Sequence, residues 1–335
     1  MSFDLIPEPQ SVTLNGDAAD SDDAGAPVPV ALPLVGRISE DRDIDDIAGV
    51  FPTQLADDIE AATGLRWDIA SDVMVAGLPA PNAATAHPVP PHASCWKSFI
   101  TLRLDPSSLE PQEYRLTIAC SGIDVVGGDT EGVRNGVQTL RQIIRQCAPA
   151  LPRLVIADKP AYKVRGYYLD ATRGRVPTLD WLKTWADRLC LYKYNQLQLY
   201  IEHTFMFDDL SETWRGTSPL KPADIIAFDE YCARLGIELV PSVSTFGHQY
   251  MAMRTRELRH LGEFPEDADR QYGFVERQRH HTLNITEPES LAFSFKLIDA
   301  YMQLFRTRKF NICGDETFDL GRGRSKPEAE RRGVA

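Results

Sequence analysis

The sequence lacks several features that mark common classes of protein. None of its 335 residues falls in an apolar run near the ~20 residues that cross a bilayer. The first residues contain neither the basic nor the apolar stretch of a secretory signal. The six cysteines are scattered and form no Cys-x-x-Cys pair, so neither a zinc site nor a disulfide framework is indicated. We therefore expect a cytoplasmic protein that uses no metal or other cofactor.

Positive charge is also scarce at one end of the chain. The sequence holds 36 basic and 48 acidic residues, a net charge of −12. This excess lies within residues 1–60, which contain 14 acidic residues and two arginines, whereas residues 61–335 contain 34 of each sign. Nucleic acids and anionic membranes bind proteins through clustered Lys and Arg. We therefore expect neither as a partner.

The segment up to residue 157 mixes strand and helix patterns and predicts a small α+β domain. Two stretches, 16–26 and 79–93, are acidic or proline-rich and predict loops. Asp129 is a suitable N-cap for a helix with Val133, Val137, Leu140 and Ile144 on one face. The other expected elements are a helix over 52–65 and strands over 99–104, 114–119 and 123–126.

From Arg165 onward, strands and helices alternate. We expect strands at 165–170, 196–201, 237–243 and 309–313, with helices at 179–192, 222–235 and 288–306. Four such units predict parallel strands, in an open sheet or a (β/α)8 barrel. No glycine-rich phosphate loop follows a strand, which disfavours the nucleotide-binding versions.

The length of this second part fits only half of a barrel. Residues 165–335 number 171, whereas a complete barrel takes roughly 250. The tail after Leu320 is polar and starts no further strand. We therefore predict an α/β protein with an α+β accessory domain over 1–157. Residues 158–335 would form an incomplete TIM-type barrel with strands one to four.

The sharpest candidate for chemistry is the carboxylate pair Asp315 and Glu316, which follows the last predicted strand. Repulsion between neighbouring carboxylates favours protonation of one of them, as a general acid requires. Adjacent side chains on an extended segment point to opposite sides, so the two carboxylates would have distinct roles. The same residues would also suit an ordinary solvated turn.

Other polar residues flank the remaining predicted strands, and all but Arg165 lie at the C-terminal ends, where barrel active sites lie. Arg165 and Asp170 suit either an internal ion pair or the binding of a sugar or anion. Glu202 and His203 suit an acid/base pair, a metal pair without a third ligand, or a solvated strand end. His248 suits either a site or a hydrogen-bonded loop histidine.

These positions resemble family 20 of the glycoside hydrolases, the β-N-acetylhexosaminidases. Residues 113–146 resemble the small domain that precedes the barrel in that family. The segments that carry the catalytic-domain resemblance are Asp158 to Arg173, Tyr192 to Asn195, Arg234 to Pro241, Gly247-His248 and Gly314-Asp315-Glu316.

The resemblance implies removal of terminal β-linked N-acetylglucosamine or N-acetylgalactosamine, with retention of configuration and attack by the substrate's own acetamido oxygen. It implies that Glu316 is the general acid and that Asp315 holds the acetamido N–H. It also implies that Arg165 binds sugar hydroxyls and that His248 orients the acid. Asp170, Glu202 and His203 are further candidates for substrate binding.

The chain departs from the family at several points, among them residues 242–248, where many members have Pro-Glu and Pro-Gly-His. Glu202 and His203 stand where many members have paired Asp, and the family's later strands have no counterpart here. We therefore expect a truncated enzyme that is weakly active or inactive alone. The alternative is a non-catalytic remnant that binds carbohydrate or forms a homodimer to cover its open strand edge.

Overall fold

A computed structural model describes residues 3–14, 29–47, 49–70 and 99–334. The chain divides into two compact units, the first made of residues 1–163 and 188–193, the second of 164–187 and 194–335. The loops expected at 16–26 and 79–93 lie outside the described residues. Within the described ranges, every helix is too short or too polar to cross a bilayer.

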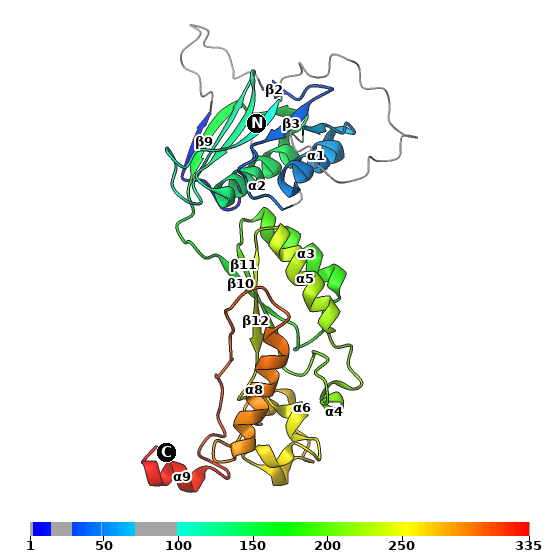
Figure 1. Ribbon diagram of the computed structural model, residues 1–335, viewed down its shortest axis with the longest axis vertical. Helices are drawn as coiled ribbons and strands as arrows, with labels where there is room; N and C mark the ends of the chain where they lie inside the picture. The colour runs from blue at the N-terminus through cyan, green and yellow to red at the C-terminus, as the bar shows by residue number, and fades with distance from the viewer. Residues whose placement is uncertain (1–2, 15–28, 48, 71–98, 335) are drawn as a thin grey trace. The chain divides into compact units, whose positions relative to one another are not determined.

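The first unit is built on a seven-stranded mixed sheet (Figure 1). Strands β7, β5, β3 and β4 run parallel, while β1, β9 and β6 add antiparallel pairs. A separate short pair joins β2 (Val30–Ala31) to β8 (Ala150–Leu151). In sheet order the strands are β1 (Ser11–Leu14), β9 (Leu154–Asp158), β6 (Tyr114–Ala119), β7 (Gly122–Gly127), β5 (Ile100–Leu104), β3 (Arg37–Glu40) and β4 (Asp68–Ala70).

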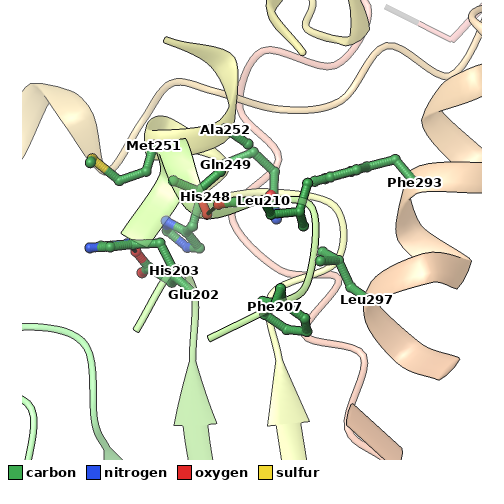
Figure 2. Close-up of a pocket in the computed structure, with 11 residues that line it drawn as sticks. Glu202, His203, Phe207, Leu210, His248, Gln249, Met251, Ala252, Phe293 and Leu297 are labelled. Atoms are coloured by element: carbon green, nitrogen blue, oxygen red, sulfur yellow. Dashed lines mark hydrogen bonds and ion pairs between the residues drawn. The ribbon is translucent and has the colours of Figure 1, made fainter. Parts of the chain in front are cut away.

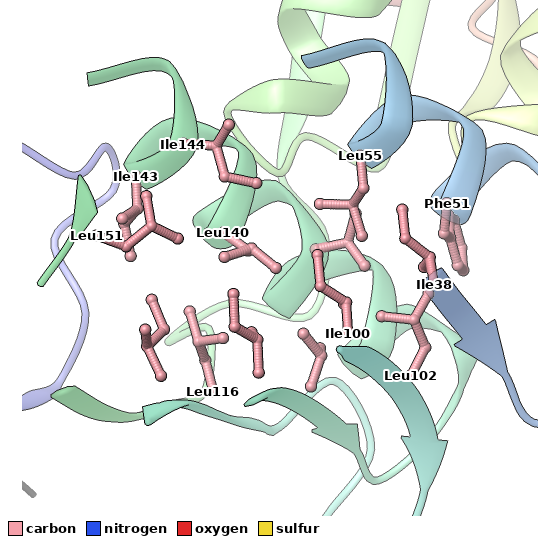
Figure 3. Close-up of a cluster of buried hydrophobic side chains, with 14 of the residues drawn as sticks. Ile38, Phe51, Leu55, Ile100, Leu102, Leu116, Leu140, Ile143, Ile144 and Leu151 are labelled. Atoms are coloured by element: carbon pink, nitrogen blue, oxygen red, sulfur yellow. The ribbon is translucent and has the colours of Figure 1, made fainter. Parts of the chain in front are cut away.

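Two helices, α1 (Val50–Thr63) and α2 (Thr130–Cys147), pack together and against this sheet. The N-cap of α2 is Asp129, whose carboxylate accepts a hydrogen bond from the Gly132 N–H at 2.7 Å, as the sequence predicts. The apolar sides of the helices and sheet form one core (Figure 3). The predicted helices and strands of this unit are thereby confirmed to within a few residues.

The second unit contains three parallel strands in sequence order, β10 (Gly166–Asp170), β11 (Gln196–Ile201) and β12 (Glu238–Val243). The connecting helices are α3 (Leu179–Leu191), α5 (Pro222–Arg234) and α8 (Pro288–Met302), and α5 and α8 pack beside β12 (Figure 1). Shorter helices are α4 (Ser211–Trp214), α6 (Tyr250–Met253), η2 (Arg259–Leu261), η3 (Pro265–Asp267), α7 (Phe274–Arg277) and α9 (Lys326–Arg332).

The prediction of a fourth strand over 309–313 is wrong. This segment lies beside β12 and pairs with it through a single parallel bridge, between Asn311 and Ser242. Cys313 has a φ of 46°, which ends the extended conformation, and Ile312 is 56% exposed. A longer ladder needs a continuous extended backbone, which this segment does not keep. The segment nevertheless brings residues 314–316 to the C-terminal side of β12.

Candidate active site

His248 and Glu316 form the central contact of the site. His248 lies in the loop after β12, and its Nε2 is 3.1 Å from Oε2 of Glu316. The His248 side chain is 3% exposed, whereas that of Glu316 is 46% exposed. The preceding Gly247 permits the close approach of the two loops, because a Cβ there would lie 2.9 Å from the carbonyl oxygen of Asp315. A buried imidazole therefore supports an accessible carboxylate.

The backbone at this contact is unusual. His248, Cys313 and Glu316 have φ values of 55°, 46° and 51°, in the left-handed region that residues with a Cβ rarely adopt. Such conformations persist where the surroundings hold them, and they gather at functional sites. Tertiary contacts therefore hold the backbone in the left-handed conformation at these three residues.

The charge state of His248 suits hydrogen bonding to a carboxyl group. Burial lowers the pKa of His248, while the carboxylates of Glu316 and Asp315 act in the opposite direction. The net decrease favours a neutral imidazole near pH 7, which can donate to a carboxylate or accept from a carboxylic acid. Donor atoms of His248, Asp315 and Glu316 lie within 4.8 Å of one another. This spacing includes the contact between His248 and Glu316 and does not by itself define a cation site.

A second polar cluster joins the ends of β10 and β11. Arg173 Nε lies 2.8 Å from Asp170 Oδ2 and 3.7 Å from Glu202 Oε1. The Tyr200 hydroxyl donates to Glu202 at 3.0 Å. Burial raises the pKa of Glu202 to about 7, against the opposing effects of the Tyr200 hydrogen bond and the Arg173 charge. Glu202 therefore changes its protonation state near neutral pH.

One member of each cluster, His248 and Glu202, lines a common pocket (Figure 2). Glu202, His203 and His248 line its polar side. Burial, together with the charge of Arg277, lowers the pKa of His203 to about 4, so this imidazole is neutral at pH 7. The apolar part of the lining comes from Phe207, Leu210, Ala252, Phe293 and Leu297.

Six of the seven predicted site residues gather at the C-terminal ends of the strands, and Arg165 does not. Arg165 directly precedes β10, so its backbone lies about 16 Å from Asp170 at the rise of an extended strand. Its amide donates to Oδ1 of Asn195 at 2.7 Å. Asp170 is ion-paired with Arg173. Any contact of Arg165 with a ligand would come from its long side chain alone.

Sequence reasoning missed a hydrogen-bonded layer beside the carboxylate pair. The Tyr168 hydroxyl is 2.9 Å from Ser242 Oγ, which is 3.1 Å from Cys313 Sγ. Burial raises the pKa of both Tyr168 and Cys313. The available signal was the two-residue period of a strand, which puts Tyr168 on the same face as Asp170.

Two models of one protein family match consecutive parts of the chain. The model described as Glycosyl hydrolase family 20, domain 2, matches residues 47–159. The model of the family 20 catalytic domain matches residues 162–328.

Curated relatives agree with this match over part of their length. Lacto-N-biosidase of Bifidobacterium bifidum is 28% identical over 225 residues, which cover 65% of this chain and 19% of the relative. A beta-hexosaminidase of Akkermansia muciniphila is 30% identical over 169 residues, covering 42% of this chain and 33% of the relative. The chain thus spans a third or less of these two relatives.

Solved structures show the same fold. Streptomyces plicatus N-acetyl-beta-hexosaminidase superposes with a TM-score of 0.68 at 21% identity, over 94% of this chain and 60% of that chain. Flavobacterium johnsoniae chitobiase gives a TM-score of 0.71 at 18% identity, over 99% and 48%. Since both family models match in succession and the fold agrees, the chain belongs to glycoside hydrolase family 20.

Proposed function

We propose that the protein containing this chain is an exo-acting β-N-acetylhexosaminidase. It would release terminal β-linked N-acetylglucosamine or N-acetylgalactosamine with retention of the anomeric configuration. The observation that carries the proposal is the contact between buried His248 and accessible Glu316, directly beside Asp315. Relatives support the substrate class, since a Streptomyces plicatus β-hexosaminidase variant was solved in complex with the product GlcNAc.

In the proposed first step, the substrate's acetamido oxygen attacks the anomeric carbon as the glycosidic bond breaks. Glu316 gives its proton to the leaving oxygen, and Asp315 accepts a hydrogen bond from the acetamido N–H, whose positive charge grows as the ring forms. In the second step, the Glu316 carboxylate takes a proton from water, which attacks the same carbon and reopens the ring. Two inversions at one carbon give net retention.

The surrounding residues would bind and orient the sugar. The neutral His248 imidazole holds the Glu316 carboxyl at 3.1 Å and so directs its proton. The role of Arg165 in binding sugar hydroxyls rests on the family resemblance alone, since Arg165 precedes β10 and the other candidates follow the strands. Asp170, Glu202 and His203 would contact the substrate at the ends of β10 and β11, and Glu202 can donate a hydrogen bond when it is protonated below its pKa of about 7.

We further propose that the second unit forms the first part of a (β/α)8 barrel, and that residues 1–335 alone turn over substrate slowly. Support comes from the solvent exposure of the carboxylate pair, since Asp315 is exposed and the side chain of Glu316 is 46% exposed. Water at a carboxylate weakens its electrostatic effect on a reacting centre. Assays therefore need high protein concentrations and a fluorogenic substrate.

The test of the proposed function is a matched pair of substrates. Purified protein is incubated with a fluorogenic β-N-acetylglucosaminide and with the β-glucoside that has a hydroxyl in place of the acetamido group. We expect hydrolysis of the first only, since the attacking oxygen belongs to the acetamido group. Equal hydrolysis of both would refute substrate-assisted catalysis, and no hydrolysis above the buffer rate would show that residues 1–335 are not an enzyme by themselves.

A second candidate function is a self-associating, non-catalytic remnant. The observation that favours it is a set of exposed apolar side chains in the second unit, where Leu291, Phe295 and Ile312 are 62%, 53% and 56% exposed. Exposed apolar surface of this kind marks contact sites or an aggregation hazard. A concentration-dependent dimer by light scattering, together with no hydrolysis, would favour this candidate.

A further inference from the structure

Two buried carboxylates near the site take no part in the proposed chemistry. Asp319 is 4% exposed and lies three residues after Glu316. Glu263 is 1% exposed and lies in the long connection between β12 and α8. Burying a charge is costly unless it is hydrogen-bonded. The partners of these two carboxylates therefore show which segments they hold together.

Asp319 connects the segment that carries Glu316 to the one that carries His248. Its Oδ2 accepts the His281 backbone N–H at 2.8 Å, and its Oδ1 lies 2.9 Å from His280 Nδ1. The carbonyl of His281 accepts the N–H of Gln249 at 3.0 Å. Since Gln249 directly follows His248, two hydrogen bonds through His281 connect Asp319 to the residue next to His248.

Glu263 binds the C-terminal end of the segment that carries Glu316. Its carboxylate accepts the Ser325 N–H at 3.0 Å, and its backbone carbonyl accepts the Arg324 N–H at 3.0 Å. The amide of Glu263 donates to the carbonyl of Thr282 at 3.1 Å. Residues 314–325, here called the Glu316 loop, are thus held at two points to the turn at residues 280–282.

We propose that Asp319 and Glu263 are positioning residues that hold the Glu316 loop against the loop of His248. Glu316 needs such support, because its side chain is 46% exposed and its backbone is left-handed at a φ of 51°. The close approach at Gly247 leaves little tolerance for movement of either loop. The inference rests on the proposed function only for the catalytic role of Glu316. The contact between Glu316 and His248 is present whether or not that role is correct.

The test measures the pKa of His248 by NMR in protein labelled with ¹³C-histidine, with the resonance assigned from a His248→Gln variant. Glu316 raises the pKa of His248 through their contact, so the Glu316→Gln variant should have a lower His248 pKa. That lower pKa is the reference value for a lost contact. We expect Asp319→Asn to lower the pKa of His248 to the same value. We expect the double variant to go no lower than Glu316→Gln alone, because both changes remove one interaction.

The matched control is Asp229→Asn, which removes another buried carboxylate of the second unit, 6% exposed on α5. It should leave the pKa of His248 unchanged even if it lowers stability. If Asp319→Asn does not fold, Glu263→Gln and the milder His280→Gln replace it. We expect each of these variants to lower the pKa of His248 by part of the full decrease. A wild-type pKa of His248 in folded Asp319→Asn or in both replacements would overturn the inference. Because no turnover is measured, the inference and the proposed function can fail separately.

Discussion

Glu316→Gln is expected to slow hydrolysis of a disaccharide with terminal β-linked N-acetylglucosamine by about 10²- to 10⁴-fold, the usual contribution of general acid–base catalysis. Glutamine keeps the shape of the side chain and a hydrogen bond to His248 at the 3.1 Å contact, but it has no proton to give to the leaving oxygen. The rates of wild type and variant are compared under identical conditions by quantifying the released monosaccharide.

The size of this loss should depend on the leaving group. A nitrophenolate departs without protonation, so Glu316→Gln should lower kcat/KM, which reports the first step only, much less for a nitrophenyl glycoside than for the disaccharide. The matched control is Glu289→Gln, since Glu289 also contacts a histidine, His260 at 2.8 Å, but is 71% exposed on α8. An equal loss for both substrates, or an equal loss in the control, would contradict the assignment of Glu316 as general acid.

Asp158→Ala is expected to destabilise the first unit by about 3–5 kcal/mol, the usual cost of breaking a buried ion pair by removing one member. Lys193 is 2% exposed, and its Nζ lies 3.4 Å from Asp158 Oδ2. The Tyr114 hydroxyl donates to the same oxygen at 3.0 Å. Loss of the carboxylate therefore breaks a buried ion pair and removes an acceptor of the Tyr114 hydroxyl.

Hydrogen exchange measured by mass spectrometry is the suitable readout, because a chain with two compact units does not unfold in one two-state transition. The opening free energy of amides in β6 reports the first unit, and peptides from β11 and β12 serve as an internal control. The double variant Asp158→Leu with Lys193→Met should recover most of the loss, because it removes the two charges together. No recovery would mean that packing at Asp158, and not its charge, sets the stability.

The long helices α1, α2, α3, α5 and α8 and the strands β5 to β7 and β10 to β12 could be predicted because their signals are local. In α2, Val133, Val137, Leu140 and Ile144 recur at helical spacing, and all four are fully buried. The segment 309–313 has the strand pattern but makes only one bridge, and β1 to β4, β8 and β9 are short strands that were not predicted. Whether a pattern becomes a strand depends on its neighbours and on the backbone at Cys313, neither of which the pattern contains.

The candidate site could be predicted in its location more than in its chemistry. Strand ends and the family resemblance placed His248, Asp315 and Glu316 together. They did not indicate that Glu202 is 7% exposed or that it shares Arg173 with Asp170. Asp319 accepts the amide of His281, 38 residues earlier in the chain, so its burial is a tertiary property that no local pattern reveals.

The stereochemistry of the first-formed sugar tests the central claim most directly. A β-N-acetylglucosaminide is hydrolysed at high protein concentration, and the anomeric protons of the product are followed by ¹H NMR before mutarotation mixes the anomers. Substrate-assisted catalysis by Asp315 and Glu316 requires the β-anomer of N-acetylglucosamine to form first, with the α-anomer following only by mutarotation. If the α-anomer forms first, water attacks the substrate directly and the proposed roles of both carboxylates are wrong.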